Sequence, residues 1–135
     1  MQFQMSTDYA VRILSYLHLH KDELSTANGI SKAVGVTYPF FIKIANRLKN
    51  EGLLEAVQGR KGGYKLARSA AEISLYDVVM AMEGKLQINR CLKDDKFCSR
   101  GDPGDCPVHD FMQDLQGKII ADLSRVHIAE LSTAS

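Results

Sequence analysis

The sequence lacks a long hydrophobic run, an export signal, low-complexity segments and internal repeats. No uninterrupted apolar stretch approaches the roughly 20 residues that span a bilayer, so a membrane-spanning protein is excluded. The N-terminal stretch MQFQMSTDYAVRIL has no basic start, apolar centre or small-residue cleavage site, so it does not fit a secretory signal. These absences predict a single-domain-sized cytoplasmic protein that has no membrane partner.

Cysteine is also scarce, because the 135 residues contain only three, all within the stretch CLKDDKFCSRGDPGDCPVH. They are Cys91, Cys98 and Cys106, and His109 follows three residues after the last. An odd number of thiols in one stretch, without an export signal, indicates a metal or redox centre rather than a disulfide framework. Thiolate and imidazole suit zinc or an iron–sulfur cluster.

The spacing of these four residues favours iron–sulfur over zinc. Six, seven and two residues separate them in turn, wider than the paired Cys-x-x-Cys knuckles of structural zinc sites. Gly101 and Gly104 leave the chain free to wrap around one centre. Three free thiols, or one disulfide with a spare thiol, are the alternatives, and His109 at a helix start can equally face solvent.

The net charge of +1 conceals an uneven distribution. Residues 1–68 hold ten Lys and Arg against five acidic residues, a net charge of +5. Residues 69–135 hold seven against eleven, a net charge of −4. Because backbone phosphates dominate nucleic-acid affinity, a basic first half is typical of a nucleic-acid-binding protein. Chance variation of the surface is the other explanation of these counts.

Hydrophobic periodicity predicts three helices followed by a hairpin in the first half. The helices are expected over 6–20, over 26–34 and from 37 to the glycine at 52. Two short extended runs, 53–57 and 63–67, are separated by a turn rich in glycine and positive charge. This is the order of a winged helix-turn-helix. The predicted fold class is mainly α with a small β-hairpin wing and a long C-terminal helix.

Local signals predict the ends and the buried faces of these helices. Ser6 or Thr7 is expected to cap the first helix, and Ser74 to cap a further helix over 74–83 through a capping box with Asp77. Three side chains of the second helix are expected to point inward: Ile30, Ala33 and Val34.

A single long helix is expected from Pro107 to about residue 131. Its apolar stripe is Val108, Phe111, Met112, Leu115, Ile119, Ile120, Leu123 and Val126. At ~1.5 Å per residue such a helix extends roughly 36 Å, too far to be covered by so small a body. A helix from a second copy is the natural cover, which predicts a homodimer and a palindromic operator. The predicted division is a DNA-binding domain (1–84), a cluster-binding loop (85–106) and a dimerisation helix with its tail (107–135).

The third predicted helix and the hairpin turn carry the candidate DNA-reading side chains. The first turn of such a helix can lie in a major groove, where Thr and Lys reach base edges or phosphates. Cations at a wing tip reach a minor groove or phosphates. A solvated helix face and a solvated turn are the alternatives. The candidates are Thr37, Tyr38, Phe40, Lys43, Arg47, Gln58, Arg60 and Lys61.

Several segments together resemble the Rrf2 family of bacterial transcription regulators. These are TDYAVRIL at the start, VTYPFFIKIANRLKNEGLL, the wing GRKGGYKLA, and SLYDVVMAMEG, followed by the three-cysteine loop and the long helix. They occur in the family's order and spacing and cover nearly the whole chain. One departure is Gln58, where the family often has Arg directly before the first wing glycine; Arg60 follows two residues later.

The resemblance implies a homodimeric winged-helix protein that binds double-stranded DNA and represses or activates transcription. One branch of the family carries an iron–sulfur cluster. In that branch Cys91, Cys98 and Cys106 correspond to cluster ligands. His109 matches the fourth ligand of the branch that regulates cluster biogenesis, which holds a 2Fe–2S centre. In nitric-oxide-responsive relatives the fourth ligand is a carboxylate of the other subunit, which here corresponds to Asp8. The wider spacing of this loop leaves a 4Fe–4S cluster as the alternative.

The sequence therefore predicts a transcription regulator whose DNA affinity is set by a cluster that senses redox state, nitric oxide or iron–sulfur status. It does not predict an enzyme. A regulator without a cluster, responding to thiol oxidation or a small molecule, is the alternative. A redox enzyme using Cys106 and His109 as nucleophile and base is a third interpretation, but it leaves the helix-turn-helix unexplained.

Overall fold

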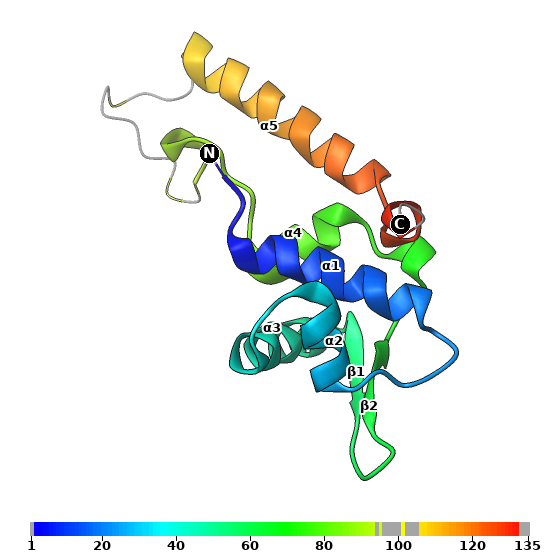
Figure 1. Ribbon diagram of the computed structural model, residues 1–135. Helices are drawn as coiled ribbons and strands as arrows, with labels where there is room; N and C mark the ends of the chain where they lie inside the picture. The colour runs from blue at the N-terminus through cyan, green and yellow to red at the C-terminus, as the bar shows by residue number, and fades with distance from the viewer. Residues whose placement is uncertain (1, 94, 96–100, 102–105, 133–135) are drawn as a thin grey trace.

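The computed structural model describes residues 2–93, 95, 101 and 106–132. Figure 1 shows the first three helices gathered at the base of a hairpin at one end of the molecule, with a long helix at the other end. The elements are α1 (Met5–Leu19), α2 (Ala27–Val34), α3 (Tyr38–Asn50), β1 (Leu54–Val57), β2 (Gly63–Leu66), η1 (Ala70–Glu72), α4 (Leu75–Glu83), η2 (Arg90–Leu92), α5 (Pro107–Arg125) and α6 (Ile128–Leu131). The predicted fold class, mainly α with a β-hairpin wing, is confirmed.

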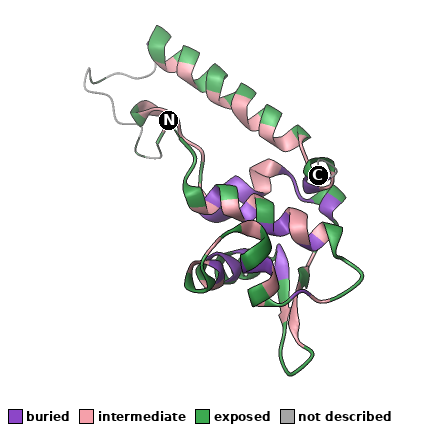
Figure 2. Ribbon diagram, in the orientation of Figure 1, coloured by how far each residue is buried: buried purple, intermediate pink, exposed green. Residues whose placement is uncertain are grey.

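The core is built around α1, which lies between α2, α3, α4 and the wing. Its apolar side chains recur at helical spacing and are buried on one face, as the purple segments of Figure 2 show. Burying each Leu or Ile side chain contributes about 1.5–3 kcal/mol before entropy is counted. The largest fully buried side chains are Phe41, Ile13, Leu14, Leu17, Ile30, Ile44, Leu48, Leu54, Ile73, Ile128 and Val78.

The predicted capping box of α4 is confirmed. The Ser74 hydroxyl accepts from the backbone N–H of Asp77 at 3.1 Å, and the Asp77 carboxylate accepts from the Ser74 N–H at 3.0 Å. The expected cap of α1 is wrong, because Gln4 occupies the N-cap position and both candidate residues lie inside the helix. Thr7 is only 3% exposed there. Its hydroxyl faces a carboxylate of α4 and so does not cap its own helix.

The inward face of α2 differs from the expected one, because Ser31 is buried on it and Ala33 does not belong to it. Ile30 is fully buried and Val34 is partly buried against the core, but Ala33 is exposed. A helix this short buries only one stripe of side chains, and Ala33 lies outside that stripe on the solvent side. Gly35 ends the helix with φ 82°, a left-handed conformation that glycine adopts without strain.

The C-terminal helix is shorter than predicted, because α5 ends at Arg125 and α6 folds back onto the core. Val126 and His127 are extended, and the Leu75 N–H donates to the Val126 carbonyl at 2.8 Å. The Ile128 N–H donates to Ile73 at 2.9 Å, and its side chain is fully buried. Val126, His127 and Ile128 are weak helix formers and follow one another directly, so little helix stability is lost when the helix stops there. The two tertiary backbone hydrogen bonds and the burial of the Ile128 side chain contribute more than the helix would gain by continuing.

The helix α5 contacts α4 and η2 but has no buried residue of its own. Its exposed apolar side chains include Val108, Phe111 and Leu115. In Figure 2 the helix is green and pink throughout. Within the described ranges, no helix combines the length and the apolar character needed to cross a bilayer.

Candidate DNA-binding face and cysteine segment

The helix-turn-helix is formed by α2, a short turn and α3. Each helix starts at a threonine cap: Thr26 accepts from the Gly29 N–H at 3.0 Å and Thr37 from the Phe40 N–H at 3.4 Å. Pro39 lies in the first turn of α3, where its missing N–H is not needed. Thr37, Tyr38 and Lys43 are exposed. The structure thus brings these predicted residues together on one helix.

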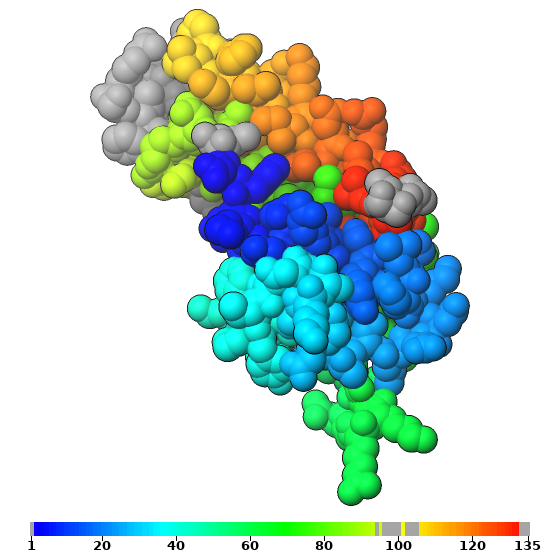
Figure 3. All heavy atoms as spheres, viewed as in Figure 1, coloured from blue at the N-terminus to red at the C-terminus, as the bar shows by residue number. Residues whose placement is uncertain are grey.

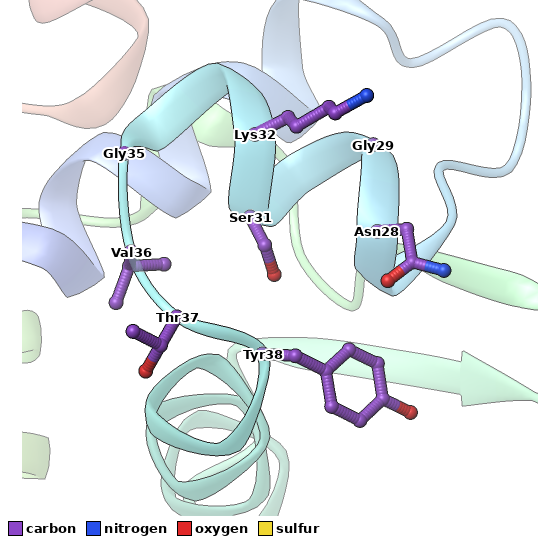
Figure 4. A pocket seen from close by; sticks show the side chains of 8 residues that line it. All are labelled: Asn28, Gly29, Ser31, Lys32, Gly35, Val36, Thr37 and Tyr38. Carbon is purple, nitrogen blue, oxygen red and sulfur yellow. The ribbon is translucent and has the colours of Figure 1, made fainter.

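An open hollow lies between α2 and the first turn of α3. Its walls include Asn28 and Lys32 of α2 and Thr37 and Tyr38 of α3. Figure 4 shows the Asn28 amide and the Tyr38 ring projecting on the same side of this hollow. Asn28 and Lys32 were not among the predicted residues. They are four residues apart and exposed, so a polar i,i+4 pair on the outer face of α2 was the available signal.

Two of the predicted α3 residues have partners inside the protein. The Phe40 ring is partly buried and meets the Tyr9 ring edge-on, with centroids 5.9 Å apart. The Nε of Arg47 donates to the backbone carbonyl of Ala81 at 2.9 Å. Lys43 is exposed beside Arg47 on a hollow that also includes Gln4.

The wing is a two-stranded antiparallel hairpin that protrudes from the body (Figure 3). In the register Glu55 faces Lys65, and their side chains pair at 3.6 Å. Three predicted residues, Gln58, Arg60 and Lys61, are exposed in its turn. A Cβ at Gly62 would lie 2.0 Å from the Val57 carbonyl oxygen, so this turn requires glycine.

The base of the wing is attached to the core through Tyr64. Its backbone exchanges two hydrogen bonds with Ser25, at 3.1 and 2.8 Å. Its ring meets the Phe41 ring edge-on at 5.2 Å. Burial raises the pKa of Tyr64, and the nearby Tyr38 raises it further. The hairpin therefore protrudes from a base that is held against α3 and the segment before α2.

The cysteine segment begins at η2 and ends at the start of α5. Cys91 lies in η2, where the Asn89 amide donates to its sulfur at 3.3 Å. Cys106 is buried at the N-cap position of α5. The Ile88 N–H donates to the Gln116 side chain of α5 at 2.9 Å, and η2 contacts α5. The structure thus brings both ends of the segment to α5, because Cys106 lies at its N-cap and η2 contacts the same helix.

The structure describes three of the predicted cluster ligands besides Cys91: Cys106, His109 and Asp8. Cys98 lies outside the described residues. His109 is in the first turn of α5, and among the described residues its Nδ1 is a buried ring nitrogen without a hydrogen-bond partner. Asp8 is exposed on α1 and pairs with Arg12 at 3.1 Å. The described parts of the chain contain no group of three His, Cys, Asp or Glu arranged to hold a metal ion.

The fold and the exposed helix-turn-helix face define a winged-helix DNA-binding protein. The profile of the Rrf2 family, described as an iron-dependent transcriptional regulator, matches residues 3–134. The chain therefore belongs to the Rrf2 family of transcription regulators, which are not enzymes.

Relatives and solved structures agree with this assignment. The chain is 35% identical over 137 residues to protein aau3 of Rhizobium meliloti, covering 91% of this chain and 84% of that one. It is 31% identical over 125 residues to the HTH-type transcriptional regulator IscR of Photorhabdus laumondii, covering 91% and 74%. The solved structure of CymR, the global cysteine regulator of B. subtilis, shares the fold with a TM-score of 0.80 at 15% identity, covering 100% and 98%.

Proposed function

We propose that the protein is a cytoplasmic homodimer that binds a palindromic operator with an affinity controlled by an iron–sulfur cluster. In this proposal residues 1–84 bind DNA, 85–106 hold the cluster and 107–135 join the two copies. The observation that carries the cluster is the buried, unpartnered Nδ1 of His109, three residues after Cys106. Buried polar atoms in proteins almost always have a partner, and coordination would supply one.

Cys91, Cys98, Cys106 and His109 would hold the cluster, with Asp8 of the partner subunit as the competing fourth ligand. Three thiolates and one imidazole suit zinc as well as an iron–sulfur cluster, and the wide spacing of the ligands favours the cluster, with 2Fe–2S as the first choice and 4Fe–4S as the second. When bound, the group supplies one-electron redox chemistry and reactivity toward nitric oxide. The chain's own part is orientation: Asn89 donates to the Cys91 sulfur, and Gln116 holds Ile88 against α5.

The exposed apolar side chains of α5 support the homodimer. Val108 is 58% exposed and Phe111 is 62% exposed, and both lie on the stripe expected to face a partner helix. Leaving such side chains in water is unfavourable, and a second copy of α5 offers a matching apolar surface. Two copies would present two α3 helices to successive half-sites of a duplex.

The DNA contacts of this proposal lie on α2, α3 and the wing. Thr37, Tyr38 and Lys43 would enter the major groove, and Arg60 and Lys61 would contact phosphates or the minor groove, next to Gln58. The exposure of these side chains supports this arrangement. Lys32 would add a phosphate contact from α2.

Anaerobic purification and reconstitution test the cluster directly. We expect iron and sulfide bound in equal amounts and visible absorption that Cys98→Ala abolishes. Asp8→Ala and His109→Ala form a matched pair, and the one that changes the spectrum identifies the fourth ligand. A duplex selected from random DNA by the loaded protein should bind it with a different affinity after cluster loss. A colourless, iron-free protein after reconstitution would contradict the cluster.

A regulator that responds to thiol oxidation without a cluster is the second candidate. The observation that favours it is that Cys91 is partly exposed in η2, where an oxidant in solution can reach its sulfur. Mass spectrometry of the oxidised protein separates the two candidates: a thiol switch gives a specific disulfide without iron.

A further inference from the structure

The last turn of α4 contacts both α3 and α1. Ala81 and Glu83, two residues apart, each hold a different helix by a hydrogen bond. Gly84 follows directly with φ 80° and leads to the cysteine segment. We propose, on the basis of the function above, that Arg47 and Glu83 are positioning residues for DNA reading. They fix α3 and α1 to this turn, and Arg47 is not itself a phosphate contact.

Arg47 stabilises the end of α4 in this arrangement. The final carbonyls of a helix have no partner within the helix, and they carry the negative end of its dipole. The Gly84 N–H donates a hydrogen bond to the Met80 carbonyl, and the Nε of Arg47 donates to the next carbonyl, that of Ala81, at 2.9 Å. Arg47 lies in the last turn of α3, so this bond ties the end of the recognition helix to the end of α4.

Glu83 supplies the cap that α1 lacks. The side chain of the α1 N-cap residue, Gln4, makes no capping bond. One carboxylate oxygen of Glu83 instead accepts from the Gln4 N–H at 3.3 Å and from the buried Thr7 hydroxyl at 2.6 Å. A carboxylate is unfavourable at the C-terminal end of its own helix and favourable at the N-terminus of another. The position of Glu83 is therefore explained by α1 and not by α4.

Arg47 ties α3 to the last turn of α4, and the two bonds of Glu83 tie α1 to the same turn, so together they give α3 a fixed orientation relative to the body of the protein. A recognition helix reads base edges only when its angle in the groove is correct, whereas phosphate attraction tolerates small rotations. Loss of the Arg47 bond or of the Glu83 bonds therefore lowers the affinity for the operator more than the affinity for random duplex. Loss of a phosphate contact lowers both affinities together and reduces the salt dependence.

A pair of substitutions at Arg47 separates the two roles. In Arg47→Gln the side-chain amide nitrogen occupies the chain position of Nε, so the donor is kept and the charge is lost. In Arg47→Lys the charge is kept, but a methylene replaces Nε. For a positioning residue we expect Arg47→Lys to lower the ratio of operator to random-duplex affinity about tenfold. Arg47→Gln should stay within about threefold of the wild type, because the donor remains.

The control is Lys43→Gln, which removes a neighbouring exposed cation. It should lower both affinities and reduce the slope of log affinity against log salt by about one. At Glu83, Glu83→Gln keeps an acceptor oxygen and should preserve the ratio better than Glu83→Ala. Thermal melting of each variant, read beside the ratio, separates lost stability from lost orientation.

Three results would overturn the inference. The first is an Arg47→Gln variant whose salt dependence of binding falls as much as that of Lys43→Gln. The second is an Arg47→Lys variant that keeps the wild-type ratio of operator to random-duplex affinity. The third is a set of variants that melt at a lower temperature but keep this ratio. A wild-type protein that binds no duplex at all contradicts the proposed function itself. That failure is distinct, because it appears before any variant is compared.

Discussion

The substitution Ile128→Ala tests whether α6 is part of the core. The Ile128 side chain is fully buried, and its N–H donates to the Ile73 carbonyl at 2.9 Å. Ile→Ala removes three carbons, worth about 2.4 kcal/mol of transfer free energy, and the remaining cavity adds to this. We expect the free energy of unfolding to fall by about 3 kcal/mol. The melting temperature should fall by about 10 °C.

The assay is thermal and urea unfolding, followed by circular dichroism at one fixed protein concentration, because the stability of the proposed dimer would depend on concentration. The control is Leu131→Ala in the same helix, where the side chain is 38% exposed. It should cost less than about 1 kcal/mol. If Ile128→Ala costs no more than this control, α6 is not docked as the structure shows, and the reasoning is refuted.

Two further substitutions test local parts of the fold. Gly62→Ala places a Cβ 2.0 Å from the Val57 carbonyl oxygen. It should cost about 1–3 kcal/mol and weaken duplex binding, because the wing must rearrange. Gly117→Ala is its control: it meets nothing within 4 Å, so it should be neutral or stabilising by up to about 1 kcal/mol. Ser74→Ala removes the acceptor for the Asp77 N–H and should cost about 1 kcal/mol in urea unfolding. Ser74→Thr keeps the hydroxyl, and an equal loss in both variants would show that the cap does not contribute.

The predictions that held depend on interactions between residues near in sequence. The Ser74–Asp77 capping box spans one turn of α4. The order of three helices and a hairpin follows from apolar periodicity and from the glycine-rich turn, and the structure has the same order. Such signals are readable because their partners are only a few residues away.

The predictions that failed depend on residues far away in the chain. The start of α1 was misplaced because its cap comes from Glu83, 79 residues after Gln4. The end of α5 was misplaced because Val126 and Ile128 bond to the segment before α4. That Arg47 contacts DNA stays a prediction, but nothing in the sequence indicated the bond from its Nε to a carbonyl 34 residues away. No local pattern contains this information.

The sequence was sufficient to predict the class of fold and the order of its elements, and it shows which donor groups the cysteine segment offers. Those follow from periodicity, capping residues and the donor types of three thiols and one imidazole. The tertiary structure decided where the helices end, which α3 side chains remain exposed, and that the His109 Nδ1 is buried. The physical reason is that burial and long-range hydrogen bonds outweigh local preferences of a few tenths of a kcal/mol per residue.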